Sequence, residues 1–294
     1  MDLKISIVMA YYNRRPQLLF TLRTLNDSKH TNFEVIVVND ASNKDQEIND
    51  VPNLFDFDIK IINIKKEEKS WVNPCIAYNI GFKHATGDII LIQNPEVCHI
   101  GDCLSFVAKN LKHDDWLTFN CYGMDNFLEN SYMKHLYENN YENVNEALYD
   151  FIVDRDEKGV FKMGGNFNFK SPGGWLNHYK EYFTAYHYMG AIFKTDLMNK
   201  MNGGFCEQYK DGICYDDNDF IKYLIHNNFS FKIPEFNVQN PFCIHQYHDK
   251  VDSPNFLEYH SKNKEVYKKR METINATLCL DIHVENFMPK PVIL

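Results

Sequence analysis

Short hydrophobic runs that end on polar residues recur along the first half of the chain. Residues 4–10 and 33–39 form two such runs, and both contain the branched side chains that favour buried strands. Between them, Pro16 suits the first turn of a helix on which Leu18, Leu22 and Leu25 share one face. The pattern therefore predicts a strand, a helix and a second strand in succession.

The alternation of strand and helix continues through most of the chain. Further strands are predicted at 59–64, 88–93, 116–121 and 191–193, and further helices at 74–85, 144–153, 217–226 and 256–274. Helices that alternate with strands through short connections indicate an α/β fold, with a mainly parallel sheet, helices on both faces and right-handed crossovers. The segment 122–185 departs from this alternation, is rich in Tyr and Asn, and is interpreted as an insertion.

Polar side chains directly follow the first two predicted strands. Tyr11, Asn13 and Arg14 come after the first strand, and Asp40 and Ser42 come after the second. In open α/β sheets, ligands bind in the crevice at the carboxyl ends of the strands. We therefore expect these residues to face one ligand pocket.

Composition and charge narrow the class of ligand. The chain has 294 residues, of which 44% are hydrophobic and 24% are charged, and its formal net charge is -9 at pH 7. These fractions suit a globular domain with a packed core. The negative charge argues against binding to a nucleic acid backbone, which needs clustered Lys and Arg. It is compatible with a divalent cation between the protein and an anionic small ligand.

The cysteines and the first residues bear on the compartment. The eight cysteines include no Cys-x-x-Cys pair, so a zinc ribbon is not expected, and a chain of this size needs no disulfide framework. The opening Met1-Asp2-Leu3-Lys4 lacks the pattern of a signal peptide, and the apolar runs are far shorter than the ~20 residues that span a bilayer. We expect a reduced, cytoplasmic location without a transmembrane anchor.

A cluster of acids stands at the start of the helix predicted at 217–226. Asp216, Asp217 and Asp219 follow the segment Gly203-Gly204-Phe205-Cys206-Glu207 at a short distance. The amino end of a helix stabilises anions through its dipole and its free amides. One acid would suffice as a cap, so the cluster is either a cap with additional acids or a functional site.

The order of the distinctive segments along the chain is informative. The sequence contains, in order, Ala10-Tyr11-Tyr12-Asn13-Arg14, Asn39-Asp40-Ala41-Ser42, Ala77-Tyr78-Asn79-Ile80-Gly81, Ala85-Thr86-Gly87-Asp88, Gly203 to Glu207, and Asp216-Asp217-Asn218-Asp219. In these motifs the chain resembles the inverting nucleotide-sugar glycosyltransferases of the GT-A fold, family 2 type, over residues 4–99 and 186–250. The resemblance implies a single GT-A domain. Its parts would be a nucleotide-sugar-binding half at 1–121, an inserted acceptor and lid region at 122–185, a catalytic and acceptor half at 186–250, and a helical extension at 251–294.

The resemblance implies a nucleotide site around Asp40. The ionised Asp40 carboxylate, which only accepts hydrogen bonds, would accept the imide N–H of uracil. The other residues implied in nucleotide binding are Ala10, Tyr11, Tyr12, Arg14, Trp71, Asn79 and Asn94. The alternative for Asp40 is a turn residue at a strand end. One of the two tyrosines is expected in the core.

The resemblance also implies a catalytic base on the acidic helix. Asp217 would take the proton from the acceptor hydroxyl as that oxygen attacks the anomeric carbon. Asp216, Asp219 and Trp175 are implied in contacts with the acceptor or the sugar, although Asp219 is alternatively structural and Trp175 is alternatively a core residue. The Gly-rich segment 164–175 is the candidate for a lid that closes over the site.

The chain departs from the family pattern at the expected metal site. Relatives end the strand after the Gly-Asp turn with Asp-x-Asp, whereas this chain has Gln93-Asn94-Pro95-Glu96. Glu96 still offers a hard oxygen ligand for Mn²⁺ or Mg²⁺, and His245, with His248 in reserve, is the expected second ligand. The alternative is a proline turn with an exposed glutamate. Tyr78 stands where relatives have Arg, so a diphosphate contact would have to come from another cation, with these candidates: Lys65, Lys66, Lys69 and Arg14.

These residues lead to one predicted function and two alternatives. The prediction is a metal-dependent glycosyltransferase of hexosyltransferase type, which moves a sugar from a UDP-sugar, or another nucleotide diphosphate sugar, to a hydroxyl acceptor such as a carbohydrate, with inversion. One alternative is a nucleotide-sugar-binding module of the same fold with weakened catalysis, and the other is a nucleotidyltransferase. The latter class normally has a glycine-rich loop after the first strand, and residues 11–16 contain no glycine. The sequence does not identify the sugar, the acceptor or the oligomeric state.

Overall fold

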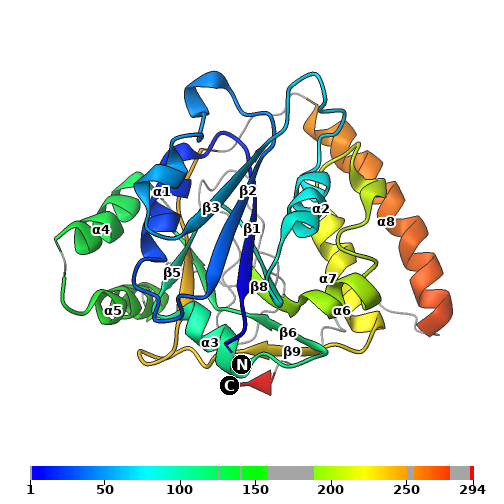
Figure 1. Ribbon diagram of the computed structural model, residues 1–294. Coiled ribbons are helices and arrows are strands. Elements are labelled where there is room, and N and C mark those ends of the chain that lie inside the picture. The colour runs from blue at the N-terminus through cyan, green and yellow to red at the C-terminus, as the bar shows by residue number, and fades with distance from the viewer. Residues whose placement is uncertain (1, 125, 140, 158–188, 250–254, 279–291) are drawn as a thin grey trace.

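The computed structural model describes the chain except for residues 1, 125, 140, 158–188, 250–254 and 279–291 (Figure 1). The strands are β1 (Ile5–Tyr11), β2 (Phe33–Asn39), β3 (Asp58–Asn63), β4 (Ile89–Gln93), β5 (Val97–Ile100), β6 (Asp115–Thr118), β7 (Cys121–Gly123), β8 (Met189–Phe193), β9 (Ser230–Ile233), β10 (Phe242–His245) and β11 (Val292–Ile293). The α-helices are α1 (Arg15–Thr24), α2 (Cys75–His84), α3 (Cys103–Asn110), α4 (Phe127–Glu138), α5 (Val144–Glu157), α6 (Lys194–Lys200), α7 (Asp216–His226) and α8 (Phe256–Leu278). Short 3₁₀ helices lie at Lys44–Gln46, Val51–Leu54 and Glu207–Tyr209.

The central sheet has eight strands in the order β11-β9-β6-β8-β4-β1-β2-β3. β1 is parallel to β2 and to β4, and β2 is parallel to β3. β8 is antiparallel to both of its neighbours, β4 and β6. The mainly parallel α/β sheet predicted from the sequence is therefore confirmed. Because Tyr11 at the end of β1 lies opposite Asn39 at the end of β2, the residues that follow these strands lie at the same edge.

Helices cover both faces of the sheet. Successive side chains of a strand point to opposite sides, so the apolar strands present apolar side chains on both faces. On one face, Ile7 and Met9 of β1 pack in a buried cluster with side chains of α1 and α3. On the other face, Val8 packs in a cluster with side chains of α2, α6, α7 and α8. The rings of Phe220 in α7 and Trp116 in β6 lie 5.5 Å apart. α7 is therefore packed against the sheet, and Figure 1 shows α8 outside it.

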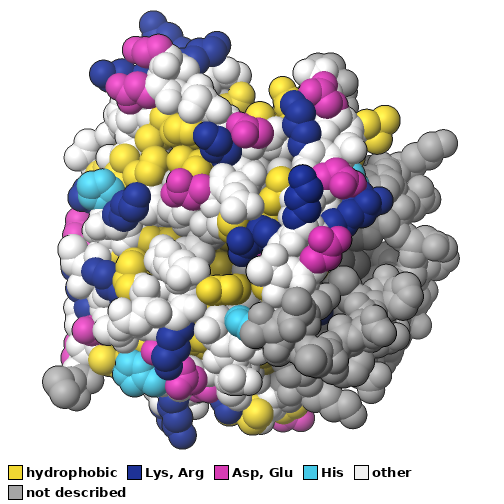
Figure 2. Space-filling view, turned by 90° about the vertical axis from the view of Figure 1, so that its right-hand side faces the viewer, with side chains coloured by type: hydrophobic (Ala, Val, Ile, Leu, Met, Phe, Trp, Pro, Cys, Tyr) yellow, Lys and Arg dark blue, Asp and Glu magenta, His cyan; other side chains and the backbone are white. Residues whose placement is uncertain are grey.

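The outer surface beside α8 is mixed in charge. On this helix, Lys262 pairs with Glu258 over 2.7 Å and Lys268 pairs with Glu265 over 2.9 Å. Figure 2 shows this side of the molecule, with basic and acidic side chains interspersed over it. The described part of this face therefore presents no continuous basic patch of the kind that a nucleic acid backbone requires.

A second, smaller sheet was not expected from the sequence. Its order is β5-β10-β7, with β10 antiparallel to β5 and parallel to β7. The prediction of one strand at 116–121 is wrong, because the chain leaves the central sheet after β6 and enters the small sheet at β7. β7 has three residues and β10 has four, which is too short for a hydrophobic period to reveal the change of sheet.

The described part of the predicted insertion at 122–185 packs on the small sheet. Met133 of α4 and Leu148 of α5 share a buried cluster with Tyr122 of β7. This part of the segment therefore contributes to a core. The Gly-rich stretch at 164–175, the candidate lid, lies outside the described residues.

Gly190 in β8 leaves the space that the indole of Trp116 fills. A Cβ atom at position 190 would lie 2.1 Å from the Cζ2 atom of the buried Trp116. We expect Gly190→Ala to lower the free energy of unfolding by about 1–3 kcal/mol, the usual cost of overpacking a core. Urea denaturation would measure the change, with Lys83→Ala at an exposed position of α2 as the control. Equal stability of Gly190→Ala and the wild type would contradict this packing.

Two findings concern the membrane and the cysteines. Within the described residues, no helix is both long enough and apolar enough to cross a bilayer. The cysteines in the same part of the chain are free thiols, of which Cys214 is exposed and Cys206 is half-buried.

Candidate active site

The loops that follow β1 and β2 are bonded to each other at the carboxyl edge of the sheet. Asn13 and Ala41 have positive φ angles of 52° and 58°, so each loop turns sharply just after its strand. The backbone N–H of Asn13 donates to Ser42 Oγ over 3.1 Å, and the backbone N–H of Asn43 donates to Asn13 Oδ1 over 2.8 Å. Asp40, the first residue after β2, is therefore held beside the β1 loop.

Asp40 is a buried carboxylate with two side-chain donors. Its side chain is 6% exposed; Lys69 Nζ donates to Oδ2 over 2.7 Å, and Trp71 Nε1 donates to Oδ1 over 2.9 Å. Lys69, one of the candidates for a diphosphate contact, thus forms an ion pair with Asp40. Each carboxylate oxygen has a second lone pair, so Asp40 can still accept a hydrogen bond from a ligand.

The structure separates the roles of Tyr11 and Tyr12. Tyr11 is fully buried and its hydroxyl donates to the Gln46 carbonyl over 2.7 Å, so it is the core residue of the pair. Tyr12 is 40% exposed, and the Lys69 ammonium lies 4.8 Å from the centroid of its ring. Ala10 is half-buried at the end of β1. Tyr12 is therefore the tyrosine whose ring is open to a ligand.

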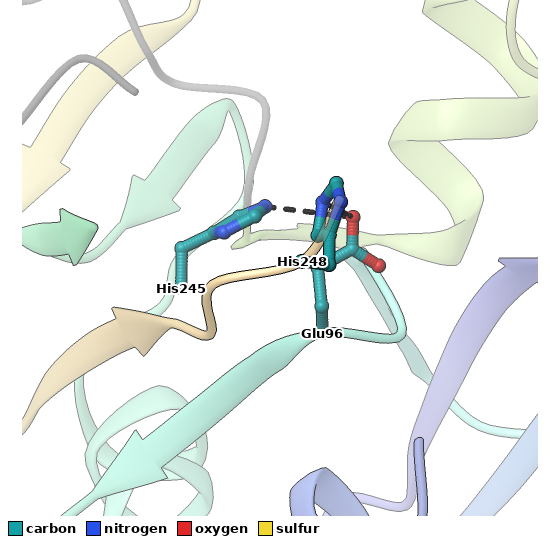
Figure 3. Close-up of side chains that lie close together, drawn as sticks. All are labelled: Glu96, His245 and His248. Carbon is teal, nitrogen blue, oxygen red and sulfur yellow. Dashed lines mark ion pairs between the residues drawn. The ribbon is translucent and has the colours of Figure 1, made fainter. Parts of the chain in front are cut away.

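Glu96, His245 and His248 form a cluster that could hold a metal ion (Figure 3). The Nε2 atoms of His245 and His248 lie 3.4 and 3.5 Å from Glu96 Oε1, and the ligand atoms all lie within 4.8 Å of one another. Two ligand atoms bound at about 2.1 Å and at a right angle are about 3 Å apart, so little movement is needed to enclose an ion. The Glu96 side chain is 12% exposed, which excludes the alternative of an exposed glutamate in a proline turn.

The ionisation of these side chains suits a metal. Burial alone would raise the pKa of Glu96, but hydrogen bonds and charge from His245 and His248 outweigh burial and hold that pKa well below its usual range. Burial lowers the pKa of His245, and Glu96 opposes only part of this shift. A carboxylate and a neutral imidazole are the forms that bind metal ions. The side chains present therefore fit a divalent cation.

Backbone pairing brings this cluster together from distant segments. His245 ends β10 opposite Val97, the residue after Glu96. The backbone N–H of Gln246 donates to the Glu96 carbonyl over 2.9 Å, and Gln246 Nε2 donates to the Gln17 carbonyl of α1 over 2.9 Å. Sequence reasoning missed Gln246, because an amide next to a histidine gives no signal of such a link.

Arg14 lies next to the cluster. Its Nη2 donates to the Asp249 carbonyl over 3.2 Å, and the same carbonyl lies 2.9 Å from His248 Nδ1. A guanidinium at the carboxyl end of β1 is thus close to the candidate metal ligands. Its planar set of N–H donors matches phosphate oxygens.

α7 begins with the acidic cluster, after Tyr215 in the left-handed region with a φ of 69°. Asp216 is buried and accepts a hydrogen bond from Asn73 Nδ2 over 2.8 Å. Asp217 is half-buried, and its Oδ1 lies 2.7 Å from the backbone nitrogen of Asn218, which donates to it. Of these two adjacent acids, Asp217 is the more accessible to a ligand.

Asp219 is bound to a different element. Arg270 of α8 donates to its carboxylate through Nε over 2.6 Å and Nη2 over 2.9 Å, and the Tyr209 hydroxyl donates over 3.2 Å. The Asp219 side chain is 3% exposed. Asp219 therefore joins α7 to α8, which agrees with its structural interpretation. No motif drew attention to Arg270.

Asn73 links the acidic cluster to α2 and was not identified from the sequence. Besides its bond to Asp216, its Oδ1 accepts from the backbone N–H of Cys75 over 2.8 Å at the start of α2. An Asn shortly before a predicted helix is a typical capping signal and could have identified it. That signal predicts the contact with the helix, but not the contact with Asp216.

Asn79 and Asn94, both expected to bind nucleotide, contact protein groups. Asn79 Oδ1 accepts from the Phe205 N–H over 2.9 Å, and its Nδ2 donates to the Phe205 carbonyl over 2.9 Å. Asn94 Oδ1 accepts from the Tyr78 hydroxyl over 2.9 Å. Each amide therefore holds a loop next to the site. Trp175 lies outside the described residues.

The pKa of Asp216 has a consequence for stability. Burial raises this pKa, the charge of Asp217 adds to the shift, and the hydrogen bond from Asn73 opposes it. Between the pKa of an unfolded Asp, about 3.9, and the raised native pKa, the native state binds more protons, so stability falls as pH rises through this window.

We expect Asp216→Asn to raise the free energy of unfolding relative to the wild type at about pH 8 and to lose this advantage below about pH 4. Denaturant titrations at the two pH values would measure the difference. Asp58→Asn, at an exposed position of β3, is the control and should show no such pH dependence. An Asp216→Asn variant less stable than the wild type at the higher pH would contradict the expectation.

Comparison with known proteins places the chain in a family. Residues 6–176 match the model of glycosyl transferase family 2. The chain is 29% identical over 116 residues to the uncharacterized glycosyltransferase YwdF of Bacillus subtilis (strain 168), a match that covers 39% of this chain and 41% of YwdF. It is 33% identical over 89 residues to the amylovoran biosynthesis glycosyltransferase AmsB of Erwinia amylovora, covering 30% of this chain and 29% of AmsB. The matches span less than half the length of these curated relatives.

Crystal structures of S. aureus TarS share the fold. TarS 1-349 in complex with UDP-GlcNAc has a TM-score of 0.57 at 15% sequence identity, over 96% of this chain and 68% of that one. Another TarS structure has a TM-score of 0.53 at 17% identity, over 96% of this chain and 41% of that one. The GT-A fold expected from the sequence is confirmed. Because the family match spans more than half of the chain, the chain belongs to glycosyl transferase family 2.

Proposed function

We propose that the chain is an inverting glycosyltransferase that moves a sugar from a nucleotide diphosphate sugar to a hydroxyl group of an acceptor such as a carbohydrate. The proposed nucleotide is UDP. Family membership supports the reaction class. TarS, which has the same fold, was crystallised with UDP-GlcNAc and with UDP, and this supports the choice of donor.

One observation supports the proposal most strongly: the candidate metal ligands and the acidic helix share a neighbour. That neighbour is the amino end of α2. The Tyr78 hydroxyl of α2 donates to Asn94 Oδ1 over 2.9 Å, two residues before Glu96. Asn73, just before α2, donates to Asp216 over 2.8 Å at the start of α7. The turn that bears Glu96 and the acidic start of α7 are therefore both bonded to the same end of α2, although they come from distant segments. Transfer from a diphosphate to a hydroxyl needs this proximity, because the diphosphate oxygen leaves the same carbon that the hydroxyl oxygen, deprotonated by the base, attacks.

The donor would bind along the carboxyl edge of the sheet. Asp40 would accept the imide N–H of uracil, while Lys69 offers a donor to a neighbouring carbonyl oxygen of the base. The open ring of Tyr12 would pack against the base or ribose. Arg14 would contact the diphosphate, next to His248.

Glu96, His245 and His248 would hold Mn²⁺ or Mg²⁺. When bound, the ion supplies Lewis-acid stabilisation of the negative charge on the leaving diphosphate. Two of the three side chains donate through imidazole nitrogen. Since Mg²⁺ strongly prefers oxygen ligands, we expect Mn²⁺ to bind more tightly.

Asp217 would act as the general base. Its carboxylate would take the proton from the acceptor hydroxyl while that oxygen bonds to the anomeric carbon and the bond from this carbon to the diphosphate oxygen breaks. A single displacement of this kind inverts the anomeric centre. Asp216, held by Asn73, would contact the acceptor or the sugar, and the pairing of Asp219 with Arg270 would keep the start of α7 in place.

A binding experiment tests the donor site. We expect Asp40→Asn to weaken UDP binding by about 10- to 100-fold, because a hydrogen bond to a charged acceptor contributes about 1.5–3 kcal/mol. Calorimetric titration with UDP in the presence of Mn²⁺ would measure the loss. Asp58→Asn, on the neighbouring strand and exposed, should bind UDP like the wild type. Equal UDP affinity of Asp40→Asn and the wild type would remove Asp40 from the donor site.

A further inference from the structure

We propose that the hydrogen bond between Tyr78 and Asn94 positions Glu96 and thereby sets the metal affinity of the site. The proposal rests on the proposed metal-binding role of Glu96. It makes Tyr78 a positioning residue, because its hydroxyl contacts the turn before Glu96 and not the metal ligands themselves.

The turn between β4 and β5 is stabilised by a hydrogen bond within the turn and by the hydroxyl of Tyr78 in α2. Within the turn, the backbone N–H of Val97 donates to the Asn94 carbonyl over 3.1 Å. From α2, the Tyr78 hydroxyl lies 2.9 Å from Asn94 Oδ1 and 3.2 Å from the Gln93 carbonyl. The single hydroxyl proton is thus shared by two acceptors, both of which come just before Glu96. Removal of this hydroxyl would therefore change the position of the turn first.

Tyr78 is a rigid support for this turn. It is only 7% exposed, and its ring centroid lies 5.3 Å from that of Phe205 and 6.2 Å from that of Phe82. Phe205 is itself fixed by the two bonds of its backbone to Asn79. A buried polar group that loses its partners costs about 1–3 kcal/mol, so the buried Tyr78 hydroxyl favours the position of the turn in which it keeps its acceptors.

The position of Glu96 matters because it provides the carboxylate of the cluster. Its Oε1 lies 3.4 Å from His245 Nε2 and 3.5 Å from His248 Nε2, so a small tilt of the turn would separate the ligand atoms. Side chains that orient metal ligands typically change metal affinity by about 10- to 100-fold when removed. Since Tyr78 acts on Glu96 through Asn94 and the backbone, we expect the lower end of this range.

The same support reaches the acidic helix. Phe205, which packs on Tyr78, also packs on Phe220 of α7, with ring centroids 4.7 Å apart. A chain of aromatic contacts therefore runs from the turn at Asn94 to the helix that bears Asp217. The Tyr78 hydroxyl contacts the turn, whereas the Tyr78 ring contacts Phe205. Removal of the hydroxyl alone should therefore affect the metal site, while the ring still supports α7 through Phe205.

Calorimetric titration with Mn²⁺ alone tests the inference. Tyr78→Phe keeps the ring and removes the hydroxyl, and we expect it to weaken Mn²⁺ binding by about tenfold. Asn94→Ala should give a similar loss, and the double variant should bind Mn²⁺ no more weakly than Tyr78→Phe, because both single variants remove the bond between Tyr78 and Asn94. Tyr137→Phe is the matched control: that hydroxyl donates to the His99 carbonyl over 3.3 Å, and its removal should leave Mn²⁺ affinity unchanged.

Each other result decides against the inference. Wild-type Mn²⁺ affinity in Tyr78→Phe overturns it, and so do losses that add in the double variant. If Tyr78→Phe does not fold, as judged by thermal unfolding, Asn94→Ala alone decides. Failure of the proposed metal site looks different: the wild type then binds no Mn²⁺, or Glu96→Gln binds it as tightly as the wild type.

Discussion

Asp217→Asn should lower kcat by ~10²- to 10⁴-fold while leaving the affinity for UDP unchanged, because the substitution removes a general base without removing a nucleotide contact. Asparagine has nearly the same shape and can still accept the bond from the backbone N–H of Asn218. The structure around the start of α7 should therefore persist. The assay is UDP release from the UDP-sugar that supports the fastest turnover in the presence of Mn²⁺.

Asn218→Ala is the control for this variant. Asn218 is exposed on the same turn of α7, and its substitution should change kcat little. Full activity of Asp217→Asn would remove Asp217 as the base. Binding of UDP without UDP release from any UDP-sugar by the wild type would instead favour the alternative of a nucleotide-sugar-binding module with weakened catalysis.

Glu96→Gln should weaken Mn²⁺ binding by more than about 100-fold. This exceeds the loss expected when a residue that only orients a metal ligand is replaced. The substitution removes the negatively charged ligand and leaves a cluster in which the other two ligands are neutral imidazoles. UDP binding should become insensitive to Mn²⁺ for the same reason. Calorimetric titration with Mn²⁺, first alone and then with UDP, measures both effects.

Glu258→Gln provides the comparison, because this exposed glutamate pairs with Lys262 on α8, away from the cluster. It should bind Mn²⁺ like the wild type. If Glu96→Gln retained tight Mn²⁺ binding, the ion would have to be held elsewhere, and the Glu96, His245 and His248 cluster would lose its proposed role.

The features that could be predicted from the sequence depend on short stretches of chain. The hydrophobic runs that form β1 and β2 are long enough to identify. These parallel strands end at the same edge of the sheet, which brings Asp40 and Arg14 to that edge. The acidic start of α7 is likewise a local signal, and so is the pair of histidines at the end of β10 and just after it.

The remaining features depend on contacts between distant segments. Lys69 lies in a polar, Lys-rich stretch, and its pairing with Asp40 becomes visible only once the loop after β3 is folded. Asn73, just before α2, contacts Asp216 of α7, and Arg270 of α8 contacts Asp219 of α7. The small sheet was missed because its strands are too short to show a period, and with it the link between Gln246 and Glu96 was missed.

Titration of the wild-type protein with UDP, with and without Mn²⁺, tests the central claim most directly. The account predicts that UDP binds and that Mn²⁺ strengthens its binding by about tenfold or more, because an ion at Glu96, His245 and His248 would share its charge with the diphosphate. Absence of UDP binding under both conditions, or UDP binding that does not respond to Mn²⁺, would contradict the proposed donor site.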